Sequence, residues 1–207
     1  MRKFKLMLPI IDLKIIHINY RCFQIVLYIR LQSLTMTQLF TLLDGRIYAK
    51  RVVRTWILTR GGIAVGQMVH NQEIAFGPAL VEAVELEQTT AIYPRVIMTD
   101  KSYQKIDNRL KQNGVYAYPS EKQSFDNLLV HYKNELKEDF YFLDFLSQSE
   151  EYDYIEDYYL LLKKAKNSVE ENINTYIDEK HTRDKYVWFK NYLLEVCQKK
   201  GVPYTRL

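Results

Sequence analysis

The chain has 207 residues, of which 47% are hydrophobic and 14% aromatic, enough to bury one substantial core. Its net charge of +4 is unevenly divided: residues 1–60 hold 11 basic residues against two acids, a net of +9, whereas the remainder holds 18 against 23, a net of −5. The two cysteines, Cys22 and Cys197, stand far apart and in no CxxC or Cys/His spacing, which argues against a zinc site or a disulfide framework and favours a cytoplasmic setting.

The N-terminus begins with basic residues and a short apolar run, which Asp12 and Lys14 interrupt before it reaches signal-peptide or membrane-span length. We therefore expect no transmembrane segment. A basic arm could bind nucleic acid or an anionic membrane surface, but its charges could equally be solvated, or the segment could be translated out of frame. Of these alternatives, we do not expect binding to nucleic acid.

The first half of the chain predicts a helix, two strands and a second helix. Thr37–Leu43 has the apolar spacing of a short helix, and the glycine-rich run from Ile57 to His70 predicts a strand whose backbone approaches another element closely. A return strand is expected over Glu73–Phe76. Gly77-Pro78 then favours a helix start, because a proline at the first helical position lacks only an N–H that would be unpaired anyway.

The rest of the chain predicts further strands and three more helices. The expected elements are a strand at Arg95–Met98, a helix at Lys101–Gln112, strands at Phe125–Tyr132 and Phe140–Phe145, and long helices at Tyr154–Ile177 and Arg183–Lys199. Mixed elements with the helices gathered late predict an α+β sandwich.

Three motifs, RGGIAVG from Arg60, FGPALVEAVELE from Phe76 and AIYPRVIM from Ala91, occur in this order. Together they resemble the central part of the class III adenylate/guanylate cyclase homology domain. The closer likeness is to the compact bacterial branch that contains the pyrimidine cyclases of the Pycsar antiphage systems. The similarity runs from about Ile57 to Met98 and continues more weakly through FYFLDFL to KYVWFKNYL.

The resemblance implies a ferredoxin-like α+β domain that forms a homodimer and converts a nucleoside triphosphate to a 3′,5′-cyclic nucleotide and pyrophosphate. It also implies two Mg²⁺ or Mn²⁺ ions, one to activate the 3′-hydroxyl and one to neutralise the triphosphate. In the family, two aspartates that precede the RGGI motif hold these ions. Only Asp12 and Asp44 precede it here, and neither has the expected sequence context, although Asp12 remains a candidate metal ligand.

The helix that begins at FGPAL departs from the family pattern at two positions. Many class III cyclases place an asparagine and, one turn later, an arginine there to stabilise the transition state, and the matching positions are Val81 and Glu85. Valine donates no hydrogen bond and glutamate has the wrong charge. The resemblance places nucleotide contacts at Arg60, Gly61, Gly62, Phe76, Gly77, Ala79 and Arg95, where Arg60 and Arg95 could also hold triphosphate oxygens through bidentate guanidinium groups.

The segment Asn19–Leu31 stands where the second metal carboxylate is expected. If Cys22, Phe23 and Gln24 are encoded TGT TTT CAG after a codon ending in A, a one-base shift of frame gives Met-Phe-Ser-Asp, and Phe-Ser-Asp is the pattern of the compact branch. A truncated or frameshifted N-terminus would also account for the absence of glutamate before Glu73. Sequencing the gene tests this hypothesis.

Three parts of the chain are therefore expected: an atypical basic segment at residues 1–56, a cyclase-like α+β core at 57–150 and a helical extension at 151–207. The predicted function is a nucleotidyl cyclase-like protein with impaired catalysis, for which the resemblance implies a role in antiphage signalling. The alternative is a non-catalytic, cyclase-like module for dimerisation or nucleotide binding. An unrelated protein that binds through its basic arm is a third reading, based only on the N-terminal charge.

Overall fold

The computed structural model describes residues 13–19, 22–29, 58–67, 69–70, 75–112, 114 and 118–207. The helix expected at Thr37–Leu43 and the carboxylates of Asp12 and Asp44 lie outside these ranges. Within them, no helix is both long and apolar enough to cross a membrane.

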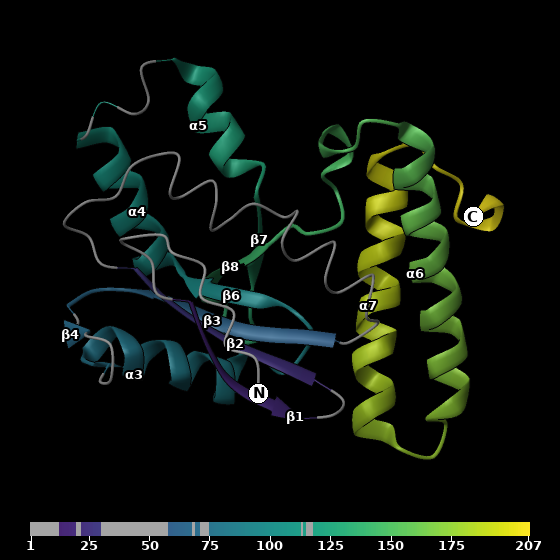
Figure 1. The fold of residues 1–207 in the computed structure, drawn as a ribbon, viewed down its shortest axis with the longest axis horizontal. Coiled ribbons are helices and arrows are strands. Elements are labelled where there is room, and N and C mark those ends of the chain that lie inside the picture. The colour runs from purple at the N-terminus through teal and green to yellow at the C-terminus, as the bar shows by residue number, and fades with distance from the viewer. Residues whose placement is uncertain are drawn as a thin grey trace.

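A six-stranded mixed sheet runs through the molecule (Figure 1). Its strands, in spatial order, are β1 (Leu13–Asn19), β2 (Cys22–Ile29), β3 (Leu58–Val65), β6 (Val96–Thr99), β8 (Asp139–Leu143) and β7 (Leu129–Lys133). β3 is parallel to both of its neighbours, and the other adjacent pairs are antiparallel. A separate ribbon joins β4 (Val69–His70) to β5 (Ala75–Phe76).

The described helices follow the strands and then dominate the C-terminal part. They are α3 (Pro78–Glu85), its π-helical continuation η2 (Leu86–Thr90), α4 (Asp100–Gln112), α5 (Pro119–Asp126), α6 (Ile155–Thr175) and α7 (Lys180–Lys199), with short 3-10 turns η3 (Ser149–Glu151) and η4 (Tyr204–Arg206). α6 and α7 form a long hairpin at one end of the sheet (Figure 1).

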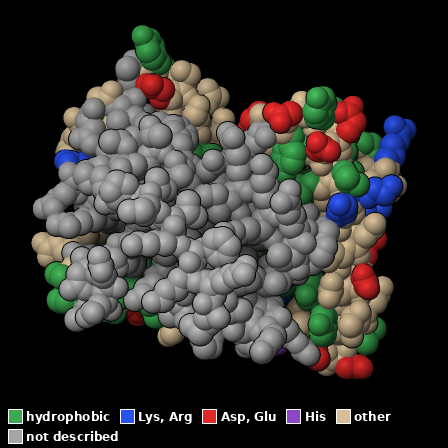
Figure 2. Space-filling model, viewed as in Figure 1, with side chains coloured by type: hydrophobic (Ala, Val, Ile, Leu, Met, Phe, Trp, Pro, Cys, Tyr) green, Lys and Arg blue, Asp and Glu red, His purple; other side chains and the backbone are tan. Residues whose placement is uncertain are grey.

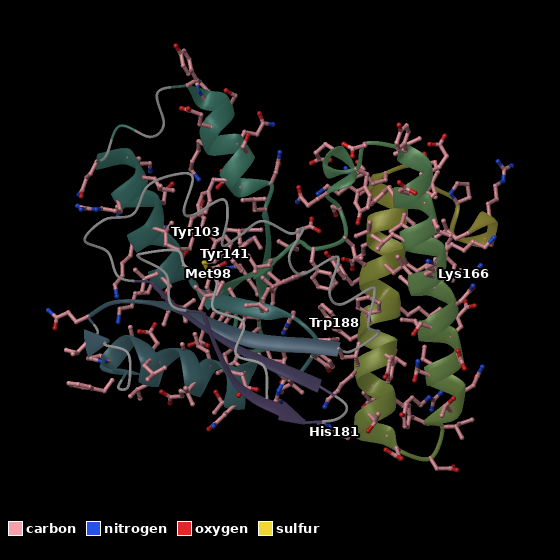
Figure 3. The ribbon with its side chains drawn as sticks, in the orientation of Figure 1. Met98, Tyr103, Tyr141, Lys166, His181 and Trp188 are labelled. Atoms are coloured by element: carbon pink, nitrogen blue, oxygen red, sulfur yellow. The ribbon has the colours of Figure 1, made fainter. Side chains whose placement is uncertain are left out.

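Different helices cover the two faces of the sheet. Gly62, Ile97 and Phe142 are register partners across β3, β6 and β8 and therefore share one face. α3 packs over Gly62 on this face, and Trp188 of α7 contacts the ring of Phe142. On the opposite face, Tyr141 of β8 stacks on Tyr103 of α4 with ring centroids 4.1 Å apart (Figure 3).

The helical hairpin shares its core with the sheet. Leu162 and Ala165 of α6 and Leu193 of α7 are fully buried in the same apolar cluster as Ile97 and Phe142. On the outer side of the hairpin, acidic, basic and apolar side chains are intermixed (Figure 2). Burial of one stripe of each helix, with a mixed outer face, is the pattern expected of amphipathic helices packed on a core.

The α+β class and the two long C-terminal helices agree with the sequence-based prediction. The strand order departs from a ferredoxin-like sheet in one respect. In that arrangement one strand separates the two strands that a helix connects, whereas β3 and β6, connected through α3, are direct parallel neighbours here. The N-terminal hairpin β1–β2 pairs with the other edge of β3, so it does not enter between β3 and β6.

One predicted strand is corrected. Phe125–Tyr132 was expected to be a single strand, but α5 occupies Pro119–Asp126 and only Leu129–Lys133 forms β7. Pro119 suits the first helical turn, and the carboxylate of Glu121 accepts a hydrogen bond from the backbone N–H of Tyr118 at 3.0 Å. These two local signals start a short helix whose Phe125 is fully buried.

Candidate functional site

The glycines of the RGGIAVG motif allow α3 to lie directly on β3. A β-carbon added at Gly62 would stand 2.2 Å from the carbonyl oxygen of Ala83 and 2.9 Å from the β-carbon of Leu86. At Gly66 it would stand 3.4 Å from the β-carbon of Ala79. We call these two contacts, Gly62 with Ala83 and Gly66 with Ala79, the strand–helix seam.

The seam places several of the predicted nucleotide contacts inside the protein. Gly61 and Gly62 are buried in the sheet, and Ala79 is buried against Gly66. Gly77 precedes the helix with φ of 146°, a conformation that favours glycine, and so directs the chain into Pro78. The glycines and alanines of the two motifs therefore have a packing role. This agrees with the prediction that the backbone of the glycine-rich strand approaches another element closely.

The remaining motif positions on α3 and β5 face outward. Phe76 is 57% exposed and Val81 65% exposed, and Glu85 is also exposed. Val69, which pairs with Phe76 across the β4–β5 ribbon, is 54% exposed. We call Val69, Phe76 and Val81 the apolar patch. Neither Val81 nor Glu85 can donate a hydrogen bond to a developing anionic charge.

Arg60 is paired with a carboxylate that sequence analysis did not single out as a partner. Its Nε lies 2.6 Å from Oε1 of Glu87, as an ion pair rather than an aligned hydrogen bond. Glu87 is only 3% exposed and lies in the π-helical turn η2. The pair therefore links the start of β3 to the end of α3, and the positive charge of Arg60 already has a buried counter-charge.

Arg95 has a different environment, formed by aromatic rings. Its guanidinium carbon lies 4.0 Å from the ring centroid of Tyr132, 5.5 Å from that of Trp188, 5.6 Å from that of Tyr93 and 5.9 Å from that of Phe142. All four distances are within the range of a cation–π contact. We call Arg95 with these four rings the Arg95 cage.

The polar groups of the Arg95 cage are incompletely satisfied. Nε of Arg95 and the hydroxyl oxygen of Tyr132 are buried and have no hydrogen-bond partner. Burial lowers the pKa of Arg95 and raises that of Tyr132. In the part of the chain that the structure describes, no carboxylate forms an ion pair with Arg95.

The two arginines are neighbours although they come from distant motifs. The backbone N–H of Gly61 donates to the carbonyl of Arg95 at 3.1 Å, and the next residues, Gly61 and Val96, are register partners. Arg60, in the first half of β3, and Arg95, directly before β6, thus lie side by side on the face that α3 and α7 cover. The sequence predicted that both could bind an anion. Among the residues that the structure describes, a buried carboxylate pairs with Arg60 and none pairs with Arg95.

The opposite face holds a second polar cluster. The hydroxyl of Tyr103 donates to Asp126 at 2.8 Å, and Lys122 Nζ lies 3.2 Å from Oδ1 of the buried Asp107. Burial, with help from the charge of Asp100, raises the pKa of Tyr141 to about 12. These contacts connect α4, α5 and β8, and we assign the cluster a structural role.

Sequence reasoning missed the aromatic partners of Arg95 and the carboxylate partner of Arg60. Tyr93 stands two residues before Arg95, but Tyr132 and Trp188 come from β7 and α7. Trp188 falls within the helix expected at Arg183–Lys199, and it lies on the side of α7 that faces the sheet (Figure 3). No local pattern links such residues, because their contact arises from the tertiary fold.

Among the described residues, no group of three or more histidine, cysteine or acidic side chains is placed to hold a metal ion. The one predicted metal ligand, Asp12, lies outside those residues. In the comparisons with known proteins, no family model, curated protein or solved structure matches the chain.

Proposed function

We propose that this chain is a nucleotidyl cyclase-type protein, related to enzymes that convert a nucleoside triphosphate to a 3′,5′-cyclic nucleotide, and that its own catalysis is impaired. The observation that carries the proposal is the ordered set of motifs RGGIAVG, FGPAL and YPR. The first two meet across the strand–helix seam, and the N–H of Gly61 in the first donates to the carbonyl of Arg95 in the third, which supports reading the three as one unit.

The residues of α3 do not fit the catalytic role that the resemblance gives this helix. Val81 is apolar and Glu85 is acidic, so neither would stabilise negative charge in the transition state. Asp12 would have to supply a carboxylate to Mg²⁺ or Mn²⁺, the ions that such chemistry uses. The substitutions in α3 therefore do not fit a metal-dependent cyclase reaction.

A cyclase assay tests the proposal. The protein is incubated separately with ATP, GTP, CTP and UTP in the presence of Mn²⁺, and both triphosphate binding and cyclic product are measured. We expect at least one triphosphate to bind and little or no cyclic product to form. Robust turnover would contradict impaired catalysis, and failure of every triphosphate to bind would contradict the nucleotidyl assignment as a whole.

A second function, a non-catalytic dimerisation module, is favoured by the apolar patch. Val69, Phe76 and Val81 are each more than half exposed, and two of them are cross-strand partners. Exposed apolar side chains that lie together commonly mark interaction surfaces, and Val69 and Phe76 are such neighbours. A second copy of the chain is the partner that the resemblance implies.

Charge in the apolar patch should weaken such a dimer. We expect Val81→Asp to shift the protein toward monomer in sedimentation-velocity experiments, because a carboxylate would lose its water on association. Leu136→Asp is the matched control, since Leu136 is 78% exposed in the turn between β7 and β8 and lies outside the patch. Equal behaviour of the two variants, or a wild-type protein that is monomeric at all concentrations, would contradict the proposed dimerisation function.

A further inference from the structure

The Arg95 cage is a built feature of the face between α3 and α7. Arg95 directly precedes β6, and its backbone N–H and carbonyl bond Tyr93 and Gly61, which fixes the base of the side chain. The four rings come from the segment before β6, from β7, from β8 and from α7. Tyr93 and Trp188 also stack on each other, with planes 11° apart. The position of the guanidinium is thus set by several independent elements.

The cage holds a cation but supplies no anion. Aromatic faces attract a guanidinium group, yet they accept no conventional hydrogen bond from its N–H groups. Nε of Arg95 and the hydroxyl of Tyr132 are both buried and unpartnered, and the guanidinium group lies over the Tyr132 ring. Buried polar groups in native proteins are nearly always satisfied, and an exception calls for a ligand, an ion or water.

Arg60 provides an internal comparison. It lies in the neighbouring parallel strand on the same face, and there the protein itself supplies a buried carboxylate, Glu87, at 2.6 Å. The adjacent Arg95 has no such partner in the described part of the chain. One position is therefore internally neutralised and the other is left open.

We propose that the Arg95 cage binds an oxyanion, a phosphate or a carboxylate group, between the sheet and α7. A guanidinium stacked on Tyr132 presents its N–H groups in a plane, and this fork matches two oxygens of such an anion. The hydroxyl of Tyr132 supplies a further donor. Arg95 is half-buried, so solvent reaches the side chain from one side. Because Arg95 is also one of the nucleotide contacts that the resemblance implies, the inference deepens the proposed function and rests on it for the source of the anion.

Titration with simple anions tests the site. Inorganic phosphate and acetate are titrated in separate series into the full chain, and binding is followed by calorimetry and by Trp188 fluorescence in a Trp56→Phe background. We expect saturable binding of at least one anion. Saturation by phosphate alone would identify a tetrahedral oxyanion as the ligand class. Saturation by acetate alone would identify a carboxylate, and saturation by both would show that the site binds oxyanions of either kind.

Substitutions at the cage separate specific binding from general attraction by a basic protein. We expect Arg95→Gln to weaken anion binding about tenfold to a hundredfold, the effect of losing hydrogen bonds to a charged group. Tyr132→Phe should weaken it less, because only one donor is removed. Arg95→Lys keeps the charge without the fork and should fall between wild type and Arg95→Gln. Arg206→Gln, an exposed arginine in η4, is the matched control and should bind like wild type.

Three results would overturn the inference. They are the absence of saturable binding by either anion, equal binding by wild type and Arg95→Gln, and equal loss of binding in Arg206→Gln. If Arg95→Gln does not fold, as judged by circular dichroism, Arg95→Lys and Tyr132→Phe carry the test on the same criteria.

Discussion

Gly62→Ala is expected to destabilise the protein by about 3 kcal/mol, at the upper end of the usual range for overpacking a core. The added β-carbon would stand 2.2 Å from the carbonyl oxygen of Ala83 and 2.9 Å from the β-carbon of Leu86. The closest of these atoms belongs to helix backbone, so no side-chain rotation relieves the contact. α3 would have to move away from β3, and urea denaturation followed by circular dichroism measures the resulting loss of stability.

Gly66→Ala is the control for this prediction. A β-carbon at Gly66 would meet only atoms of Ala79, the nearest being its β-carbon at 3.4 Å, which is close to ordinary van der Waals contact. We expect a change within about 1 kcal/mol, because the substitution also reduces the freedom of the unfolded chain. If Gly62→Ala were as mild as Gly66→Ala, the seam would not be the reason for the glycine at position 62.

The seam also shows how far the sequence could predict the fold. Glycine in the strand and proline after glycine at the helix start are local signals, so β3 and α3 were predicted from their own residues. The spacing of apolar residues in the last third of the chain likewise predicted α6 and α7 within a few residues of their observed bounds. Elements whose cause is local or periodic were therefore accessible.

Strand order was less accessible because it depends on distant pairings. Nothing in the residues of β1 and β2 specifies which edge of β3 they pair with, and the structure places them on the side away from β6. α5 was missed for a different reason, since its eight residues are too short for a periodic signal and it starts from Pro119 and Glu121.

In the candidate site, too, some features could be predicted from the sequence and others depend on the tertiary structure. The two arginines were recognised as possible anion ligands from their positions beside the motifs, yet their environments differ because of residues far along the chain. Glu87 is turned inward to Arg60 by the π-helical turn, whereas Trp188 reaches Arg95 from the C-terminal helix. The difference between a neutralised and an open guanidinium is thus a property of the tertiary structure.

The attachment of α7 to the rest of the protein depends on a buried hydrogen-bond network around Asp144. The carboxylate, in a residue 3% exposed, accepts hydrogen bonds from the hydroxyl of Tyr192 at 2.7 Å and from the backbone N–H of Ser147 at 3.0 Å. The Tyr192 oxygen in turn accepts from the N–H of Leu146 at 3.1 Å. Burial raises the pKa of Tyr192 well above its ordinary value, so the phenol keeps its proton and donates to Asp144.

Asp144→Ala is accordingly expected to cost about 3 kcal/mol or more. It leaves two buried donors, the Tyr192 hydroxyl and the Ser147 N–H, without an acceptor, and each such loss costs about 1–3 kcal/mol. The measurement is the free energy of unfolding from urea denaturation. An effect below about 1 kcal/mol would show that water replaces the carboxylate as acceptor and that the hydrogen-bond network is open to solvent.

Tyr192→Phe completes a double-mutant cycle that isolates the contact between the two residues. Alone it should cost about 1–2 kcal/mol, because Leu146 loses an acceptor while Asp144 keeps its bond from Ser147. Combined with Asp144→Ala it should cost less than the sum of the single changes, since the orphaned hydroxyl is then absent. Additive costs would mean that the two groups stabilise the protein independently, and the attachment of α7 would then rest on its apolar face, where Phe189 and Leu193 are buried.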